Sequence, residues 1–213
     1  MVFLVFQSFQ VILCHSYFFI AMVLMTPQPV LRLSMSVNII FKEGHSGKSC
    51  SDMDFSLSYV NRVLSPAGIN VSLRGCRVIP YLENSDPGGL ENEESFHRDS
   101  LMDEGADINV FVIPTIPSND GTLAYTRFFN NERYIVIGET VYDGNKVYIR
   151  FQPGRFSNML VHEIGHLLGL EHVDTRGSLM YPSQLKDMDP QIGVEEFLSQ
   201  SEINSMRSYI LSR

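Results

Sequence analysis

The alternation of apolar and polar residues marks the start of the folded part of the chain. From Leu31 to Phe41 every second residue is apolar, and most of the residues between them are polar. A period of two is typical of a strand with one buried face, so a strand is expected over 31–41. Shorter apolar runs predict further strands over 70–79, 108–113, 123–128, 134–137 and 147–151.

A first helix is expected after the opening strand. Asp52 can cap this helix, and Pro66 with Gly68 can end it. Between these points apolar residues recur at helical spacing. They are Phe55, Tyr59, Val60, Val63 and Leu64.

Two later segments also predict helices. Ser157 or Asn158 can start one of them, and Gly169 can stop it because glycine tolerates the left-handed conformation. Ser199 and Glu202 form the S-x-x-E capping box of a C-terminal helix. Several strands with few helices predict an α/β or α+β sheet domain.

The N-terminal segment differs in composition from the rest of the chain. The first 31 residues contain no Lys, Arg, Asp or Glu, and an apolar run extends from Val11 to Met25. We interpret residues 1–30 as a secretory signal, which predicts a secreted or extracytoplasmic protein. An uncleaved membrane anchor within residues 1–25 is the alternative, because about 20 apolar residues can span a bilayer. A third interpretation is a misassigned start, with translation beginning at Met22, Met25 or Met35.

Length and charge narrow the class of protein. The 213 residues, of which 44% are hydrophobic, suffice for one domain of ordinary size, expected over residues 31–213. The formal net charge of -8 argues against nucleic-acid binding, which needs a basic face. A monomer is expected.

The negative charge is concentrated in residues 83–107, which carry nine carboxylates against the single Arg98. A solvated acidic loop is expected there, and a calcium site stays an open alternative. Outside the N-terminal segment the cysteines are Cys50 and Cys76. One disulfide and two buried thiols are both compatible with the sequence. No C-x-x-C pair exists, which excludes a thiolate zinc site.

The stretch HEIGHLLGLEH begins at His162 and places three histidines and two glutamates within one short segment. His162 and His166 are four residues apart, so both project from one face of a helix toward one cation. Glu163 approaches the same point from a neighbouring angle, where it can hold a water molecule instead of binding the metal. After a turn at Gly169, His172 can return to that cation.

Three imidazoles with a fourth position left to water are typical of a catalytic zinc site, whereas structural zinc sites are closed by four protein ligands. Zinc polarises a substrate carbonyl, and Glu163 would take the proton of the attacking water and pass it to the leaving amine. The pattern therefore predicts hydrolysis of peptide bonds in a protein or peptide substrate. A catalytically silent zinc module that only holds peptides is the alternative.

The same stretch resembles the extended zinc-binding signature of the metzincin endopeptidases. The sequence SLMYP, from Ser178 to Pro182, resembles the Met-turn of that clan, in which Met180 would lie beneath the metal. Within the clan the chain looks most like the matrixins. Residues 121–125 resemble the matrixin edge strand, and residues 198–204 resemble the opening of the matrixin C-terminal helix.

This resemblance implies a metzincin-like fold. A twisted five-stranded mixed sheet would have the active-site helix beneath it, in an upper lobe over residues 31–169. A small lower lobe over residues 170–213 would end in a helix.

The resemblance also implies how a substrate binds. Leu123 and Ala124 would lie on the edge strand that receives an extended peptide. Tyr181 and Pro182 would belong to the wall of the pocket for the residue after the cleaved bond, where the family prefers an apolar side chain.

The chain departs from the family pattern in three respects. Matrixins hold a second, structural zinc largely through histidines, and Tyr125 stands where one of these would be, so we expect one zinc ion. Astacin-like relatives use a tyrosine two residues after the methionine as an extra ligand, and Pro182 occupies that position here. No inhibitory propeptide with its switch cysteine is recognisable, so latency by that mechanism is not expected.

Overall fold

The computed structural model divides the chain into two units, Met1–Val30 and Leu31–Arg213. Only Pro29 and Val30 of the first unit are described, so the predicted leader lies almost wholly outside the described residues. Among the described residues, no helix is long and apolar enough to cross a membrane. The structure describes residues 29–42, 49–81, 101–117, 122, 124–129, 132–143, 146–148, 153–175, 178–181 and 198–212.

A mixed β-sheet is the framework of the unit Leu31–Arg213. Five strands follow the order β2–β1–β3–β5–β4, and a short sixth strand, β6, pairs with the end of β5. The first four strands in this order run parallel, whereas β4 is antiparallel to β5. The predicted five-stranded mixed sheet is therefore confirmed. The strands are β1 (Leu31–Lys42), β2 (Ile69–Tyr81), β3 (Ile108–Pro117), β4 (Ala124–Phe129), β5 (Glu132–Asp143) and β6 (Lys146–Tyr148).

Strand β2 forms the outer edge of the sheet opposite β4, and it is irregular. Its register against β1 shifts between Met35 and Ser36, which leaves Arg74 as the extra residue of a bulge. The guanidinium of Arg74 donates a hydrogen bond to the carboxylate of Asp103 at 3.0 Å. Pro80 lies near the end of the same strand, opposite Phe41 of β1.

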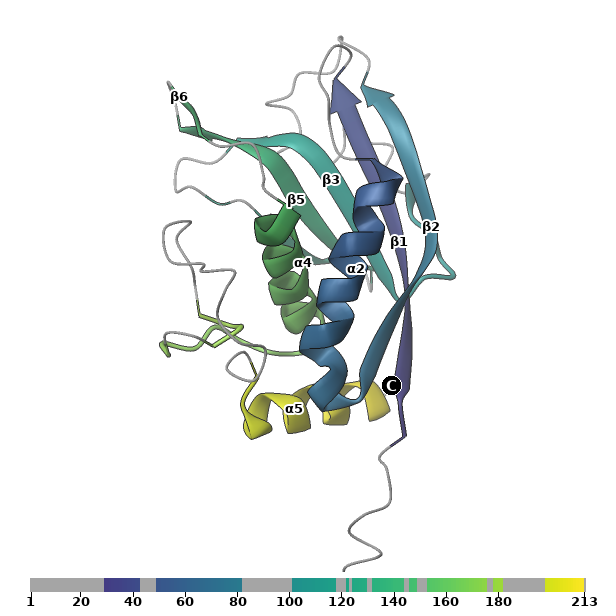
Figure 1. The fold of residues 1–213 in the computed structure, drawn as a ribbon, viewed down its shortest axis with the longest axis vertical. Coiled ribbons are helices and arrows are strands. Elements are labelled where there is room, and N and C mark those ends of the chain that lie inside the picture. The colour runs from purple at the N-terminus through teal and green to yellow at the C-terminus, as the bar shows by residue number, and fades with distance from the viewer. Residues whose placement is uncertain are drawn as a thin grey trace, which may run out of the picture. The chain divides into compact units, whose positions relative to one another are not determined.

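Two helices pack against one face of the sheet, as Figure 1 shows for α2 (Cys50–Leu64) and α4 (Pro153–Leu167). They contact each other and share the main apolar core with inward-facing residues of the strands. The C-terminal helix α5 (Gln200–Leu211) adds Met206 to this core, and the short helix η1 (Ser65–Ala67) adds Ala67.

The opposite face of the sheet carries a smaller apolar cluster. Phe111 and Tyr134 pack edge to face there, and Leu101 and Met102 cover them in part. Asn38 holds this cover in place, because its amide donates to the carbonyl of Leu101 at 3.1 Å.

Two helix starts differ from the prediction. Ser49 is the N-cap of α2, and Asp52, at the N3 position of the capping box, accepts a hydrogen bond from the Ser49 amide at 2.7 Å. Phe55, one of the apolar residues at helical spacing, is 57% exposed. Helix α4 begins at Pro153, one turn before Ser157, because proline is well tolerated in the first turn of a helix.

The C-terminal helix follows the sequence pattern. Ser199 caps α5 and accepts the Glu202 amide at 3.3 Å, so the predicted capping box is confirmed. Cys50 and Cys76 form a disulfide between the first residue of α2 and strand β2, which decides between the two alternatives for these cysteines. The division into lobes at 169/170 stays a prediction.

Candidate active site

Helix α4 presents two histidines on one face near its C-terminal end. The ring centroids of His162 and His166 lie 4.9 Å apart. His162 is 8% exposed, and His166 is half-buried. The helical spacing of four residues thus brings both imidazoles to one side, as the sequence indicates.

A tight turn after α4 redirects the chain. The amide of Gly169 donates to the carbonyl of His166, and that of Leu170 donates to the carbonyl of Gly165, both at 3.0 Å. This pair of bonds is the Schellman motif, and Gly169 adopts its left-handed conformation with φ of 83°. A Cβ at Gly169 would also lie 3.0 Å from the ring of Tyr209.

The turn brings the exposed His172 back to the other two histidines. Its Nε2 lies 3.2 Å from Nε2 of His162 and 3.1 Å from Nε2 of His166. One ligand atom from each histidine lies within 4.8 Å of the others. Within the part of the chain that the structure describes, no other group of three metal-binding side chains meets this criterion.

Backbone carbonyls fix the orientation of two of these rings. Nδ1 of His162 lies 2.6 Å from the carbonyl oxygen of Leu179, and Nδ1 of His166 lies 2.9 Å from that of Leu170. A carbonyl only accepts, so each Nδ1 carries the proton and each Nε2 keeps its lone pair. Burial lowers the pKa of His162 to about 4, which keeps its ring neutral at pH 7.

This donor set fits a divalent cation. His172 can donate a proton to only one of the two facing Nε2 atoms, so at least one short nitrogen–nitrogen contact has no hydrogen bond across it and is repulsive. A cation between them removes that repulsion. Tetrahedral zinc with bonds of about 2.0–2.1 Å needs ligand nitrogens about 3.3 Å apart, close to the observed separations.

Glu163 follows His162 on α4 and is buried. Burial raises the pKa of its carboxyl to about 7, while a hydrogen bond from Thr126 of β4 acts in the opposite direction. The Thr126 hydroxyl lies 2.7 Å from the Glu163 carboxylate and 3.1 Å from its backbone carbonyl. A carboxyl group with a pKa near neutrality can exchange protons at physiological pH.

Met180 is completely buried beneath α4. A Cβ at Gly165 would lie 2.6 Å from the Met180 sulfur, so the glycine between the two helical histidines is what permits this approach. Leu179, the neighbour of Met180, supplies the carbonyl that orients His162. The Met-turn and the histidine cluster are therefore one packed unit.

A hydrogen-bond relay ties the Met-turn to α5. The buried carboxylate of Glu202 accepts the Ser178 hydroxyl at 2.8 Å and the Ser199 amide at 2.6 Å. The Ser178 oxygen in turn accepts the Met180 amide at 3.1 Å. The capping carboxylate of the C-terminal helix thus also supports the floor of the candidate site.

The remaining residues predicted for substrate binding are placed in part. Ala124 is half-buried and begins β4, the last strand in the order of the sheet. Tyr181 is half-buried and follows Met180 directly. Leu123 and Pro182 lie outside the described residues.

Sequence reasoning missed several supporting residues. The carbonyls of Leu179 and Leu170 leave no trace in the sequence, because any residue type supplies them. Thr126 needs the pairing of β4 with β5 to reach Glu163. Gly165 offered a signal, since a glycine inside a helix has a cost that close packing can explain.

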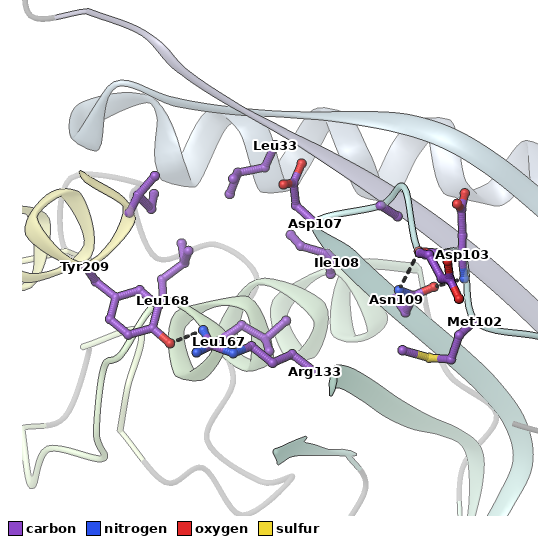
Figure 2. Close-up of a pocket in the computed structure, with 13 residues that line it drawn as sticks. Leu33, Met102, Asp103, Asp107, Ile108, Asn109, Arg133, Leu167, Leu168 and Tyr209 are labelled. Atoms are coloured by element: carbon purple, nitrogen blue, oxygen red, sulfur yellow. Dashed lines mark hydrogen bonds between the residues drawn. The ribbon is translucent and has the colours of Figure 1, made fainter. Parts of the chain in front are cut away.

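A separate cavity of about 620 Å³ opens near the C-terminal end of α4. Figure 2 shows Leu167 of α4, Leu168 directly after it and Tyr209 of α5 in its wall, with Arg133 hydrogen-bonded to the Tyr209 hydroxyl. None of the three clustered histidines lines it. The cavity is therefore distinct from the candidate metal site.

The candidate site combines the signature helix, the returning histidine and the Met-turn packed beneath them, on a mixed sheet with an antiparallel edge strand. These features define a metallopeptidase of the metzincin clan. The family model of the matrixins matches residues 97–205, just over half of the chain. The chain belongs to the matrixin family. The resemblance found in the sequence is confirmed, and with it the class of zinc metalloendopeptidases.

Two solved structures are similar to this chain. Mature mirolysin of Tannerella forsythia, in complex with a cleaved peptide, has a TM-score of 0.54 and 14% identity over 85% of this chain and 92% of that one. Metalloproteinase-II of Bacteroides fragilis has a TM-score of 0.48 and 19% identity over 86% of this chain. The match spans only 55% of that protein's chain. A search of curated proteins found no match.

Proposed function

We propose that this protein is a zinc-dependent endopeptidase in which His162, His166 and His172 bind the metal and Glu163 is the general base. The convergence of the three imidazoles, with a buried carboxylate on the residue after His162, carries the proposal. Matrixins are zinc metalloendopeptidases, which supports the same conclusion.

Each group has a distinct part in the reaction. His162, His166 and His172 would hold a zinc ion, which would supply a Lewis acid for the peptide carbonyl and a bound water with a pKa of about 7. The Glu163 carboxylate accepts a proton as the water oxygen attacks the carbonyl carbon. It then delivers that proton to the amine nitrogen as the carbon–nitrogen bond breaks. Thr126 holds the carboxylate in place through its hydroxyl.

An extended peptide is the proposed substrate, bound along β4. Backbone pairing with a sheet edge gives affinity without regard to sequence. The hydrogen bond from Thr126 to Glu163 supports this, because it links β4 directly to the proposed base. The mirolysin structure contains a cleaved peptide on a similar fold. One zinc ion per chain and export of the protein complete the proposal.

Replacing Glu163 by Gln tests the assigned base. The amide cannot accept the proton, so turnover of an unstructured protein should fall by about 10²–10⁴-fold while one zinc ion stays bound. Peptide cleavage by the unmodified protein should stop with a chelator and return with zinc. Product release by mass spectrometry and metal content by elemental analysis measure both effects.

The exposed Glu104 offers a matched control, and Glu104→Gln should cleave like the unmodified protein. Full turnover in Glu163→Gln would remove Glu163 from the mechanism. Tight binding of uncut peptides with no products from any variant would favour the silent peptide-binding module instead.

A further inference from the structure

The cavity of about 620 Å³ near the end of α4 has a largely apolar wall. Its leucine and isoleucine side chains come from the strands β1 and β3, from residues 167–168 and from α5. They are Leu33, Ile108, Leu167, Leu168 and Ile210. A volume within about 300–1,000 Å³ and a mainly apolar lining are typical of sites for small ligands. The wall therefore suits a ligand with an apolar body.

One end of the cavity carries a cation. Arg133, near the start of β5, is the only lysine or arginine among the described residues that line it. Its guanidinium donates to the Tyr209 hydroxyl and lies 5.2 Å from the centre of that ring, which holds the group in place (Figure 2). A guanidinium carries five donors in a planar fork, so it can bind a hydroxyl and a carboxylate together. This end fits the carboxylate of a ligand.

Another part of the lining is acidic and includes Asp103 and Asp107. The carboxylate of Asp103 pairs with the guanidinium of Arg74 at 3.0 Å. Asp107 is held by neutral groups instead, because its Oδ2 accepts the amide and the hydroxyl of Ser34, both at 2.7 Å. These hydrogen bonds orient the Asp107 carboxylate without cancelling its charge. This end of the cavity fits the ammonium group of a ligand.

We propose that the cavity is a second binding site, which takes short apolar peptides with both termini free. Figure 2 shows the side chains of Asp107 and Arg133 on opposite sides of Ile108. A peptide lying across Ile108 would place its carboxylate at Arg133 and its ammonium at Asp107. A purely anionic ligand would face the acidic end, and a purely cationic one would face Arg133. The inference is independent of the proposed peptidase activity, because binding needs no turnover.

Calorimetric titration of the zinc-loaded protein with the tripeptide Leu-Ala-Leu tests the site. We expect a Kd between about 10 μM and 1 mM, as the binding efficiency of small ligands allows. Gly-Gly-Gly has the same termini without apolar side chains, so it should bind at least about tenfold more weakly. Equal binding of the two peptides, or no binding of Leu-Ala-Leu at about 10 mM, overturns the inference.

A double-mutant cycle locates the carboxylate of the peptide. Amidation of the C-terminus removes the carboxylate, and Arg133→Gln removes the cation. Either change alone should raise the Kd by about tenfold, and both together should do no more, because they break the same contact. Additive losses would place the carboxylate elsewhere, for example at the histidine cluster, and overturn the inference. Arg32→Gln, at an exposed arginine outside the cavity, is the matched control and should keep the original Kd.

A second cycle at the acidic end decides the question if Arg133→Gln does not fold. N-acetylation removes the ammonium of the peptide, and Asp107→Asn removes the charge while keeping an oxygen for the Ser34 donors. Each change should raise the Kd by about two- to fivefold, since Asp107 is exposed, and the losses should again not add. Additive losses, or an acetylated peptide that binds as tightly as the free one, overturn the inference.

Discussion

The candidate active site has two halves, which the rest of the structure holds in place in different ways. One half, His162 with Glu163, is buried, and its partners come from distant parts of the chain. Leu179, which orients His162, is 17 residues away in sequence, and Thr126, which holds Glu163, is 37 residues away. This half exists only when the Met-turn and β4 are in place.

The other half is local. His166 is oriented by Leu170, four residues further on, and His172 returns through the Schellman turn at Gly169. His172 is exposed to solvent. A short stretch of sequence can therefore encode this half almost alone, whereas the buried half depends on the whole fold.

Removing one histidine from each half should separate these dependences. His162→Ala and His172→Ala should both weaken zinc binding by more than about 100-fold, because each removes a ligand. In the zinc-free proteins, only His162→Ala should lower the free energy of unfolding, by about 1–3 kcal/mol, since it leaves the Leu179 carbonyl unpaired. His172→Ala should stay within about 0.5 kcal/mol. Chelator competition and urea unfolding measure the two quantities, and equal destabilisation by both variants would contradict the distinction.

Filling the space between α4 and the Met-turn should disturb the buried half next most strongly. A Cβ at Gly165 meets the Met180 sulfur at 2.6 Å, so Gly165→Val should cost about 1–3 kcal/mol of unfolding free energy. Gly75→Val is the control, because the nearest atom to a Cβ at Gly75, Ser36 Oγ, is 3.9 Å away. Urea unfolding of both variants gives the comparison. A stable Gly165→Val protein would show that the Met-turn can move away without cost.

The smallest expected effect concerns the link from β4. The Thr126 hydroxyl stabilises the charged form of Glu163, so Thr126→Val should raise the pKa of that carboxyl further above its usual value. A general base must be ionised, so the acidic limb of the kcat/KM profile should move to higher pH. Thr126→Ser keeps the hydroxyl and should leave the limb in place. A limb that stays or moves to lower pH in Thr126→Val would contradict the assigned interaction.

Features that depend on neighbours in sequence could be predicted. The period of two identified β1, the glycine at position 169 identified the end of α4, and Ser199 with Glu202 identified the cap of α5. In each case the determining atoms lie within a few residues of each other. Local chemistry is sufficient there.

Features that depend on tertiary contacts could not be predicted from the sequence. The sequence allowed either a disulfide or two free thiols for Cys50 and Cys76, and only the packing of α2 against β2 decided between them. Phe55 has helical spacing yet faces solvent, because the apolar pattern gives the period of a helix more reliably than its rotation. The sequence also could not predict that Oδ1 of Asn158 is buried without a hydrogen-bond partner, because hydrogen bonds can be assigned only in a folded structure.

The bulge and the proline in β2 bear on the solubility of the protein. The proposed peptidase would bind extended polypeptides at the β4 edge of its sheet, and an even strand at the opposite edge could pair with another copy of the chain. The register shift at Arg74 and the missing amide hydrogen of Pro80 disturb the even ladder that such fibre-like growth requires. The two edges of the sheet thus differ in their capacity to pair with another strand, and removing the bulge from β2 would favour aggregation.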